Sequence, residues 1–122
     1  MIEDYGALVR VLAVAQSVEL PASGTLYVTA IEVWEGAVVL HVVEQLPEFL
    51  PPGEPIEPNR PRWMLSDDLG TMYIPQGGGT SGSQAQRTST FAFAGTVPAA
   101  ARTLFVVGPG MTDDQMVRIP LD

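Results

Sequence analysis

Glycine and proline divide this chain into short apolar segments. Its 122 residues include 12 glycines and 11 prolines, and these lie mainly between the apolar runs. This arrangement is typical of short strands separated by turns. No run approaches the roughly 18 apolar residues that a membrane-spanning helix needs. The spacing therefore predicts an all-β domain without membrane insertion.

Eight segments have the β-branched or aromatic content of strands. They cover residues 7–14 (with 20 as the alternative end), 25–34, 37–46, 62–66, 71–74, 88–95, 102–107 and 116–121. The first segment also fits helical spacing, so a helix is its alternative. The two residues Glu35-Gly36 separate the second and third strands, which indicates a tight hairpin.

The third of these strands is apolar on both faces, which is typical of a central strand. Alternate residues share a face, so one face carries Val38, Leu40 and Val42 and the other carries Val39, His41 and Val43. In the segment 88–95 the two faces carry Phe91 and Phe93, and Thr90 and Ala92.

Two segments are predicted to be loops. Residues 47–61 hold six prolines, which exclude a helix or a central strand, and we expect a long loop crossing between two sheets. Residues 76–86 are rich in glycine and serine, and we expect a second loop there. The strand spacing predicts one domain over 1–122, an antiparallel β-sandwich of about seven to eight strands with Greek-key connections. A small barrel is the alternative.

Several short motifs follow one another in the second half of the chain. They are Trp63-x-Leu65-x-Asp67-Asp68-x-Gly70-Thr71-x-Tyr73, then Phe91-x-Phe93, then Pro98-x-x-Ala101-Arg102-x-Leu104. This run resembles bacterial immunoglobulin-like domains of the telokin-like kind. The order of elements is similar from about Val11 to Leu121. The resemblance implies an immunoglobulin-like sandwich and brings no catalytic residues. Many such domains are exported or lipid-anchored.

Charge and composition exclude several function classes. The chain has 14 acidic residues and 6 basic ones, a net charge of −8, so we expect no nucleic acid as a partner. There is no cysteine and only one histidine, His41, which excludes disulfides, thiol chemistry and a multi-histidine zinc site within one chain. The acidic start, Met1-Ile2-Glu3-Asp4, differs from a secretory signal. We expect a cytoplasmic protein, with export as the alternative.

No motif assigns catalytic, cofactor-binding or metal-binding residues. Gly77-x-Gly79-x-x-Gly82 matches a dinucleotide-binding spacing, but no helix is predicted after it, so a loop is favoured. His41 has no nominated nucleophile, and we expect a packed or half-exposed residue. The doublets Asp67-Asp68 and Asp113-Asp114 are expected at opposite ends of the sandwich, too far apart for one ion.

Trp63 is expected in the core and Trp34 at the edge of the sheet, in preference to a shared sugar-stacking surface.

Because no motif assigns catalytic residues, we expect no enzyme. The favoured function is a non-catalytic module that binds a protein partner or a second copy of itself. Long loops on a rigid sandwich commonly present binding sites. The candidate surface lies on the loops at one end and consists of Glu48, Phe49, Leu50, Glu54, Ile56, Glu57, Asp113 and Asp114.

Two further expectations concern this function. Self-association would use an exposed edge strand, with 116–121 as the candidate. The alternative function is a small-ligand or calcium-binding domain that uses the same loops.

Overall fold

The computed structural model describes residues 5–20, 24–45, 63–82, 86–108, 111 and 113–121. Eight strands and one short 3₁₀ helix lie within these ranges. They are β1 (Leu8–Leu20), β2 (Gly24–Trp34), β3 (Ala37–Gln45), β4 (Met64–Asp67), β5 (Ile74–Gly82), β6 (Gln86–Ala94), β7 (Thr103–Val107), η1 (Asp113–Gln115) and β8 (Val117–Pro120). No helix in this part of the chain has the length and apolar character needed to cross a membrane.

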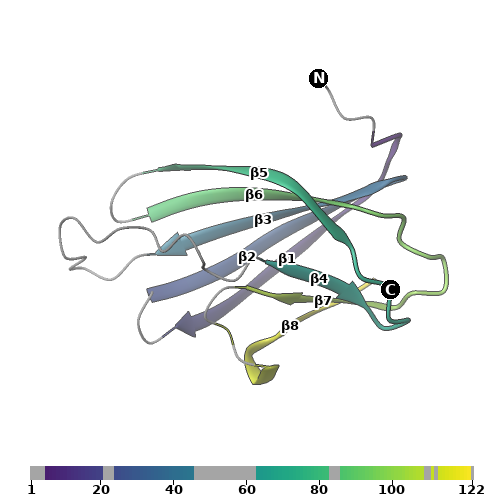
Figure 1. The fold of residues 1–122 in the computed structure, drawn as a ribbon. Helices are drawn as coiled ribbons and strands as arrows, with labels where there is room; N and C mark the ends of the chain where they lie inside the picture. Colours follow the sequence, from purple (N-terminus) through teal and green to yellow (C-terminus); the bar gives the residue numbers. More distant parts are fainter. Residues whose placement is uncertain are drawn as a thin grey trace.

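The strands form two antiparallel sheets that pack as the layers of a sandwich (Figure 1). One sheet has the order β1-β2-β3-β6-β5 and the other β4-β7-β8. If β1 is set aside, this is the strand order of a constant-type immunoglobulin sandwich, four strands against three. The predicted all-β sandwich with Greek-key connections is thus confirmed, and the barrel alternative is wrong. β3 and β4 lie in different sheets, so the chain crosses between the sheets there, although the proline-rich residues 47–61 fall outside the described ranges.

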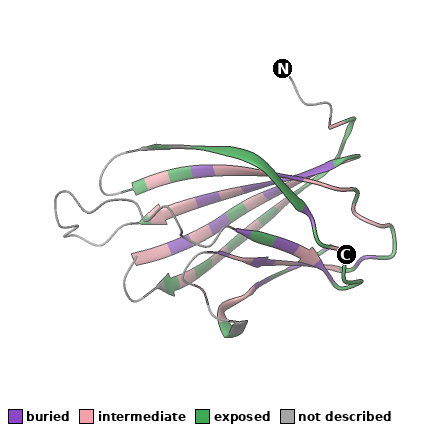
Figure 2. Cartoon of the chain, viewed as in Figure 1, coloured by how far each residue is buried: buried purple, intermediate pink, exposed green. Residues whose placement is uncertain are grey.

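The core lies between the two sheets and is mainly aliphatic, with the aromatic side chains of Trp63, Tyr73 and Phe93 among the aliphatic ones. In Figure 2 buried positions alternate with more exposed ones along β2, whereas β3 begins with four buried residues in a row. The larger sheet contributes Leu26, Val28, Ile31, Val33, Val38, Leu40, Val42 and Phe93, and the smaller one Leu65, Leu104, Val106, Val117 and Ile119. Trp63, expected in the core, is 7% exposed. The central position predicted for the third strand is confirmed, since β3 lies between β2 and β6.

A bulge in β2 reverses which residues face the core. Val28 pairs with Val42 but Ala30 pairs with His41, so Thr29 is an extra residue in β2. Strict alternation from Val28 would turn Ile31 outward, whereas with the bulge Ile31 is fully buried. The same reversal turns Glu32 and Trp34 to the outer face of the five-stranded sheet.

β1 is a strand rather than the alternative helix, and its side chains reach the smaller sheet. Leu12, Val14 and Val18 pack against the core. Gln16 Nε2 donates a hydrogen bond of 2.8 Å to the carbonyl oxygen of Arg118, and the Arg10 guanidinium donates to that of Leu121. The free edge of β8 is therefore covered by side chains of β1.

The expected loop over 76–86 is wrong for most of its length. β5 runs from Ile74 to Gly82 and pairs with β6 as the outer strand of the larger sheet. Edge position explains how it tolerates Pro75, because one side of an edge strand needs no donors. The strand expected over 71–74 is wrong as well: residues 71–73 make one isolated bridge, Ser66 to Met72, with β4, and Ile74 is already the first residue of β5.

Candidate functional site

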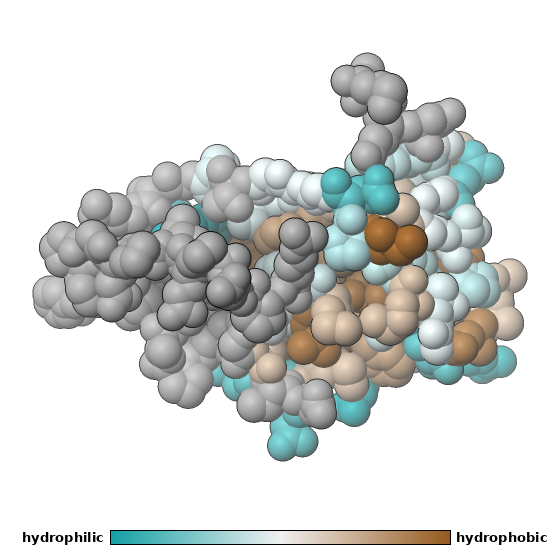
Figure 3. Space-filling model, viewed as in Figure 1, coloured by the Kyte–Doolittle hydropathy of each residue, from teal (hydrophilic) through white to brown (hydrophobic). Residues whose placement is uncertain are grey.

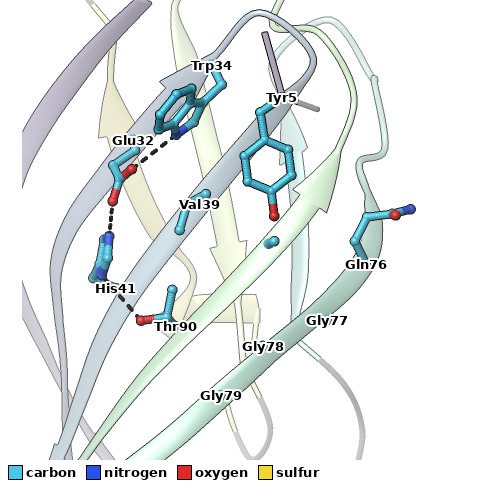
Figure 4. A pocket seen from close by; sticks show the side chains of 11 residues that line it. Tyr5, Glu32, Trp34, Val39, His41, Gln76, Gly77, Gly78, Gly79 and Thr90 are labelled. Atoms are coloured by element: carbon cyan, nitrogen blue, oxygen red, sulfur yellow. Dashed lines mark hydrogen bonds and ion pairs between the residues drawn. The ribbon is translucent and has the colours of Figure 1, made fainter. Parts of the chain in front are cut away.

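A shallow hollow of about 550 Å³ lies on the outer face of the five-stranded sheet (Figure 4). β2, β3, β6 and β5 all contribute to it, together with the residues that precede β1. Its lining consists of Tyr5, Glu32, Trp34, Val39, His41, Gln76, Gly77, Gly78, Gly79, Thr90 and Ala92. Val39 points away from the core but is only 7% exposed, because the larger side chains around it rise above the sheet.

A chain of polar contacts forms one side of the hollow. Glu32 accepts a hydrogen bond of 3.1 Å from Trp34 Nε1 at its Oε1. Its Oε2 lies 2.5 Å from His41 Nε2. On the other side of the imidazole, Nδ1 lies 3.5 Å from the Thr90 hydroxyl. Both oxygens of Glu32 are thus held in place by donors from neighbouring side chains.

Two aromatic rings form one end of the hollow. Tyr5 and Trp34 have ring centroids 5.9 Å apart at an angle of 58°. Tyr5 is held against the β2–β3 hairpin, because its carbonyl oxygen accepts a hydrogen bond of 2.9 Å from the Gly36 amide. Gly6 has φ of 78°, a backbone conformation that suits glycine, and this turn brings the tyrosine ring toward the tryptophan.

The glycines of β5 form the side opposite Glu32, and the structural reason for having glycine differs from one position to the next. A Cβ on Gly78 would lie 2.3 Å from the Thr90 carbonyl oxygen, so close pairing with β6 demands glycine there. Gly79 has no atom within 4 Å of a Cβ position and no positive φ. Neither packing nor backbone conformation therefore explains the glycine at 79.

The geometry does not favour nucleophilic catalysis by Thr90. The order Glu32, His41, Thr90 matches acid, base and hydroxyl, but 3.5 Å between Thr90 Oγ1 and His41 Nδ1 is longer than the 2.6–3.2 Å that proton abstraction typically needs. Thr90 lies within β6, which is paired on both sides. Backbone N–H groups of such a strand lie in the plane of the sheet, so they do not form an oxyanion hole above it.

The first acidic doublet stabilises a turn. Asp67 is 3% exposed, and its Oδ1 accepts hydrogen bonds from the Leu69 and Thr71 amides. Its Oδ2 accepts one of 2.7 Å from the Tyr73 hydroxyl. Burial alone would raise the pKa of Asp67, but these hydrogen bonds, that of Tyr73 first, outweigh it, so the pKa lies below its usual value. Asp67 therefore holds the turn after β4 through its own hydrogen bonds.

The candidate surface predicted from the loops is largely untested by the structure. Its members Glu48, Phe49, Leu50, Glu54, Ile56 and Glu57 lie outside the described residues. Asp113 and the exposed Asp114 belong to η1, whose Gln115 donates to the carbonyl oxygen of Glu19 at the end of β1. Among the residues that the structure describes, no three acidic or histidine side chains are grouped so as to hold a metal ion.

The second acidic doublet lies at the other end of the sandwich from the first. Asp68 accepts a hydrogen bond from the amide of Arg102, just before β7, whereas η1 contacts the far end of β1. The expected separation of the two doublets is confirmed.

The sequence predicted the environment of single residues of the hollow, but not the contacts between them. His41, for which the sequence predicts a packed or half-exposed residue, has a side chain that is 31% exposed. Its partner Glu32 could have been found only by locating the bulge at Thr29, because strict alternation places Glu32 on the core side. Trp34 is half-buried beside the hollow.

No family model, curated protein or solved structure matches this chain.

Proposed function

We propose that this chain is a non-catalytic protein-interaction module that pairs with an extended segment of a partner along the open edge of β5. The carrying observation is β5 itself, which among the described strands is an edge strand of nine residues with no charged side chain. Its proline and its one bulge lie at its beginning, between Pro75 and Gly77, so residues 77–82 pair regularly with β6 and leave their other side to a partner. Such edges readily accept another strand, and natural proteins commonly guard them with charge, proline or cover. The telokin-like immunoglobulin resemblance supports the same class, since it brings no catalytic residues.

The other edges in the described part of the fold are less accessible. Side chains of β1 donate to the carbonyl oxygens of Arg118 in β8 and of Leu121 just after it. The segment before β5 covers β4, since the Tyr73 amide donates to the Leu65 carbonyl oxygen and the Asp67 amide to that of Thr71. β1 has two register shifts, one of them in the middle of the strand, and a non-glycine residue at positive φ, Ala15, whereas the single shift of β5 lies at its beginning. Such bulges discourage strand pairing. These contacts favour β5 over the strand at 116–121 as the pairing edge.

Exposed apolar side chains lie beside the beginning of β5. Met64, Met72 and Ile74 are 52%, 55% and 64% exposed. Figure 3 shows the face that carries β4 and β7, where brown and tan surface is prominent. Clustered apolar surface of this kind is typical of protein contacts, so a partner strand on β5 would find apolar contacts at one end of its path.

A charge placed on the edge tests this proposal. Ser81→Lys adds a guarding charge to β5, and Ala13→Lys adds the same charge to an exposed position of β1. Peptides would be selected from a random display library on the wild-type domain, and their dissociation constants measured with all three proteins. We expect Ser81→Lys to weaken binding at least tenfold and Ala13→Lys to leave it within about twofold, with amide exchange on β5 slowed by the peptide.

Two results would contradict the proposal. One is that no peptide is selected and the domain alone stays monomeric at all concentrations. The other is that selected peptides bind Ser81→Lys as well as the wild type. A dimer that Ser81→Lys dissociates would support strand pairing, with a second copy of this chain as the partner.

A further inference from the structure

The hollow beside β5 contains an open space that folding does not require. Gly79 lines it, and a side chain there would meet no atom within 4 Å and no strained backbone. Glycine weakens strands relative to residues with a Cβ. A glycine that costs stability without a structural reason is explained if it keeps the space above β5 free for a ligand.

The lining of the hollow is complementary to positive charge. It includes the carboxylate of Glu32 and no lysine or arginine, and the whole chain has a net charge of −8. A positively charged ligand is therefore attracted over a long range and meets one fixed carboxylate at the end of its path.

The arrangement of acceptor and rings favours a flat cation. Trp34 and His41 each contact one oxygen of Glu32, so the carboxylate is oriented before any ligand arrives, and its remaining lone pairs can accept further donors. A guanidinium group is planar, stacks on aromatic faces and bonds carboxylates, whereas an ammonium is a compact and strongly hydrated point charge. Tyr5 and Trp34 offer such faces at the end of the hollow.

We propose that the hollow binds the guanidinium group of an arginine side chain, between the Tyr5–Trp34 pair and the carboxylate of Glu32. Gly77 and Gly79 of β5 line the hollow and have no atom within 4 Å of a Cβ position, so the space between the sheet edge and this pocket is open at both residues. The origin of this arginine rests on the proposed function, because we place the arginine in the partner segment that pairs with β5.

Small probes test the pocket apart from strand pairing. The indole N–H signals of Trp34 and Trp63 would be followed by NMR while N-acetyl-arginine-methylamide is added to the wild-type domain at low ionic strength. Trp34 borders the hollow and Trp63 lies in the core, so we expect a saturable shift at Trp34 and none at Trp63. The citrulline analogue, neutral and of the same shape, should bind at least tenfold more weakly, and the lysine analogue should also bind more weakly.

Two variants complete the experiment. Glu32→Gln keeps the size of the side chain and removes its charge, and we expect at least tenfold weaker binding of the arginine probe. Gly79→Leu fills the hollow from β5 and should abolish the shift, while an unchanged Trp63 signal shows that each variant is folded. Equal binding of the arginine and citrulline probes, or no shift at Trp34, would overturn the assignment.

The outcomes separate this inference from the proposed function. If the arginine probe fails but Ser81→Lys still blocks selected peptides, the pocket assignment is wrong and the interaction module stands. If the probe binds as expected but no peptide pairs with β5, the guanidinium site stands and strand pairing is wrong.

Discussion

At the scale of single residues, the most constrained group is the buried carboxylate of Asp67. It accepts hydrogen bonds from two backbone amides and from the Tyr73 hydroxyl. The pKa of Tyr73 is raised, first by burial and then by its hydrogen bond to Asp67 and the negative charge of that residue. The pair thus ties the turn after β4 to the beginning of β5, and the ionised form of Asp67 is the one that the fold stabilises.

This linkage predicts how stability changes with pH. Because the pKa of Asp67 is lower in the folded protein than its ordinary 3.8, ionised Asp67 stabilises the fold above about pH 4, and this contribution is lost as the pH falls through the folded value. We expect Asp67→Asn to cost roughly 1.5–3 kcal/mol at pH 7, the usual range for hydrogen bonds to charged groups. The difference from wild type should narrow below about pH 4 in urea unfolding followed by circular dichroism.

The exposed Asp114 provides the control for this experiment. Asp114→Asn removes the same charge from the surface and should change the free energy of unfolding by less than about 0.5 kcal/mol. A gap between Asp67→Asn and wild type that stays constant down to pH 2 would show that the charge of Asp67 is not what stabilises the turn.

At the scale of strands, the sequence predicted seven of the eight strands in the right places and failed at β5. Val, Ile and Phe at alternate positions make β2, β3 and β6 recognisable, because their apolar faces repeat with the period of a strand. β5 lacks such a pattern, because its glycines and polar residues follow a single large aliphatic side chain, Ile74, and this composition is typical of a loop. What makes it a strand is pairing with β6, a long-range contact that local preference does not contain.

The same limitation applies to the hollow. Its residues lie on strands that are adjacent in space but distant in sequence, and the bulge at Thr29 decides which face of β2 they occupy. A single extra residue in a ladder leaves no clear mark in composition. Trp34 and His41 could therefore be predicted individually, while the contact between Glu32 and His41 could not.

Two neighbouring glycines of β5 predict opposite responses to the same substitution. Gly78→Ala would place Cβ 2.3 Å from the Thr90 carbonyl oxygen, and we expect a loss of roughly 1–3 kcal/mol, as for other overpacked sites. Gly79→Ala meets open space and should stabilise by about 0.5 kcal/mol through lower entropy of the unfolded chain. Urea midpoints of both variants measure the difference, and a destabilised Gly79→Ala would show that this glycine is required by the fold after all.

At the scale of the whole molecule, the sandwich is closed along one side by side chains rather than by strand pairing. β1 and β8 lie in different sheets, and Arg10 and Gln16 of β1 donate to carbonyl oxygens of β8 and of Leu121 just after it. Pro120 within β8 has no N–H to offer a partner strand. These contacts both fasten the two sheets together and occupy an edge that could otherwise pair with another chain.

This dual role gives the last prediction. The double variant Arg10→Met with Gln16→Met keeps the apolar length of both side chains but removes their donors. We expect a loss of roughly 1–3 kcal/mol for two hydrogen bonds, measured by urea unfolding. The solution mass should also rise with concentration, because the carbonyl oxygens of β8 become available to another strand.

The matched double variant Gln86→Met with Arg87→Met makes the same changes on β6, away from the contacts between β1 and β8, and should remain at the mass of the wild type. If both double variants behave alike, the contacts from β1 do not protect the edge of β8. Another feature would then have to explain why β5, rather than β8, is accessible to a partner strand.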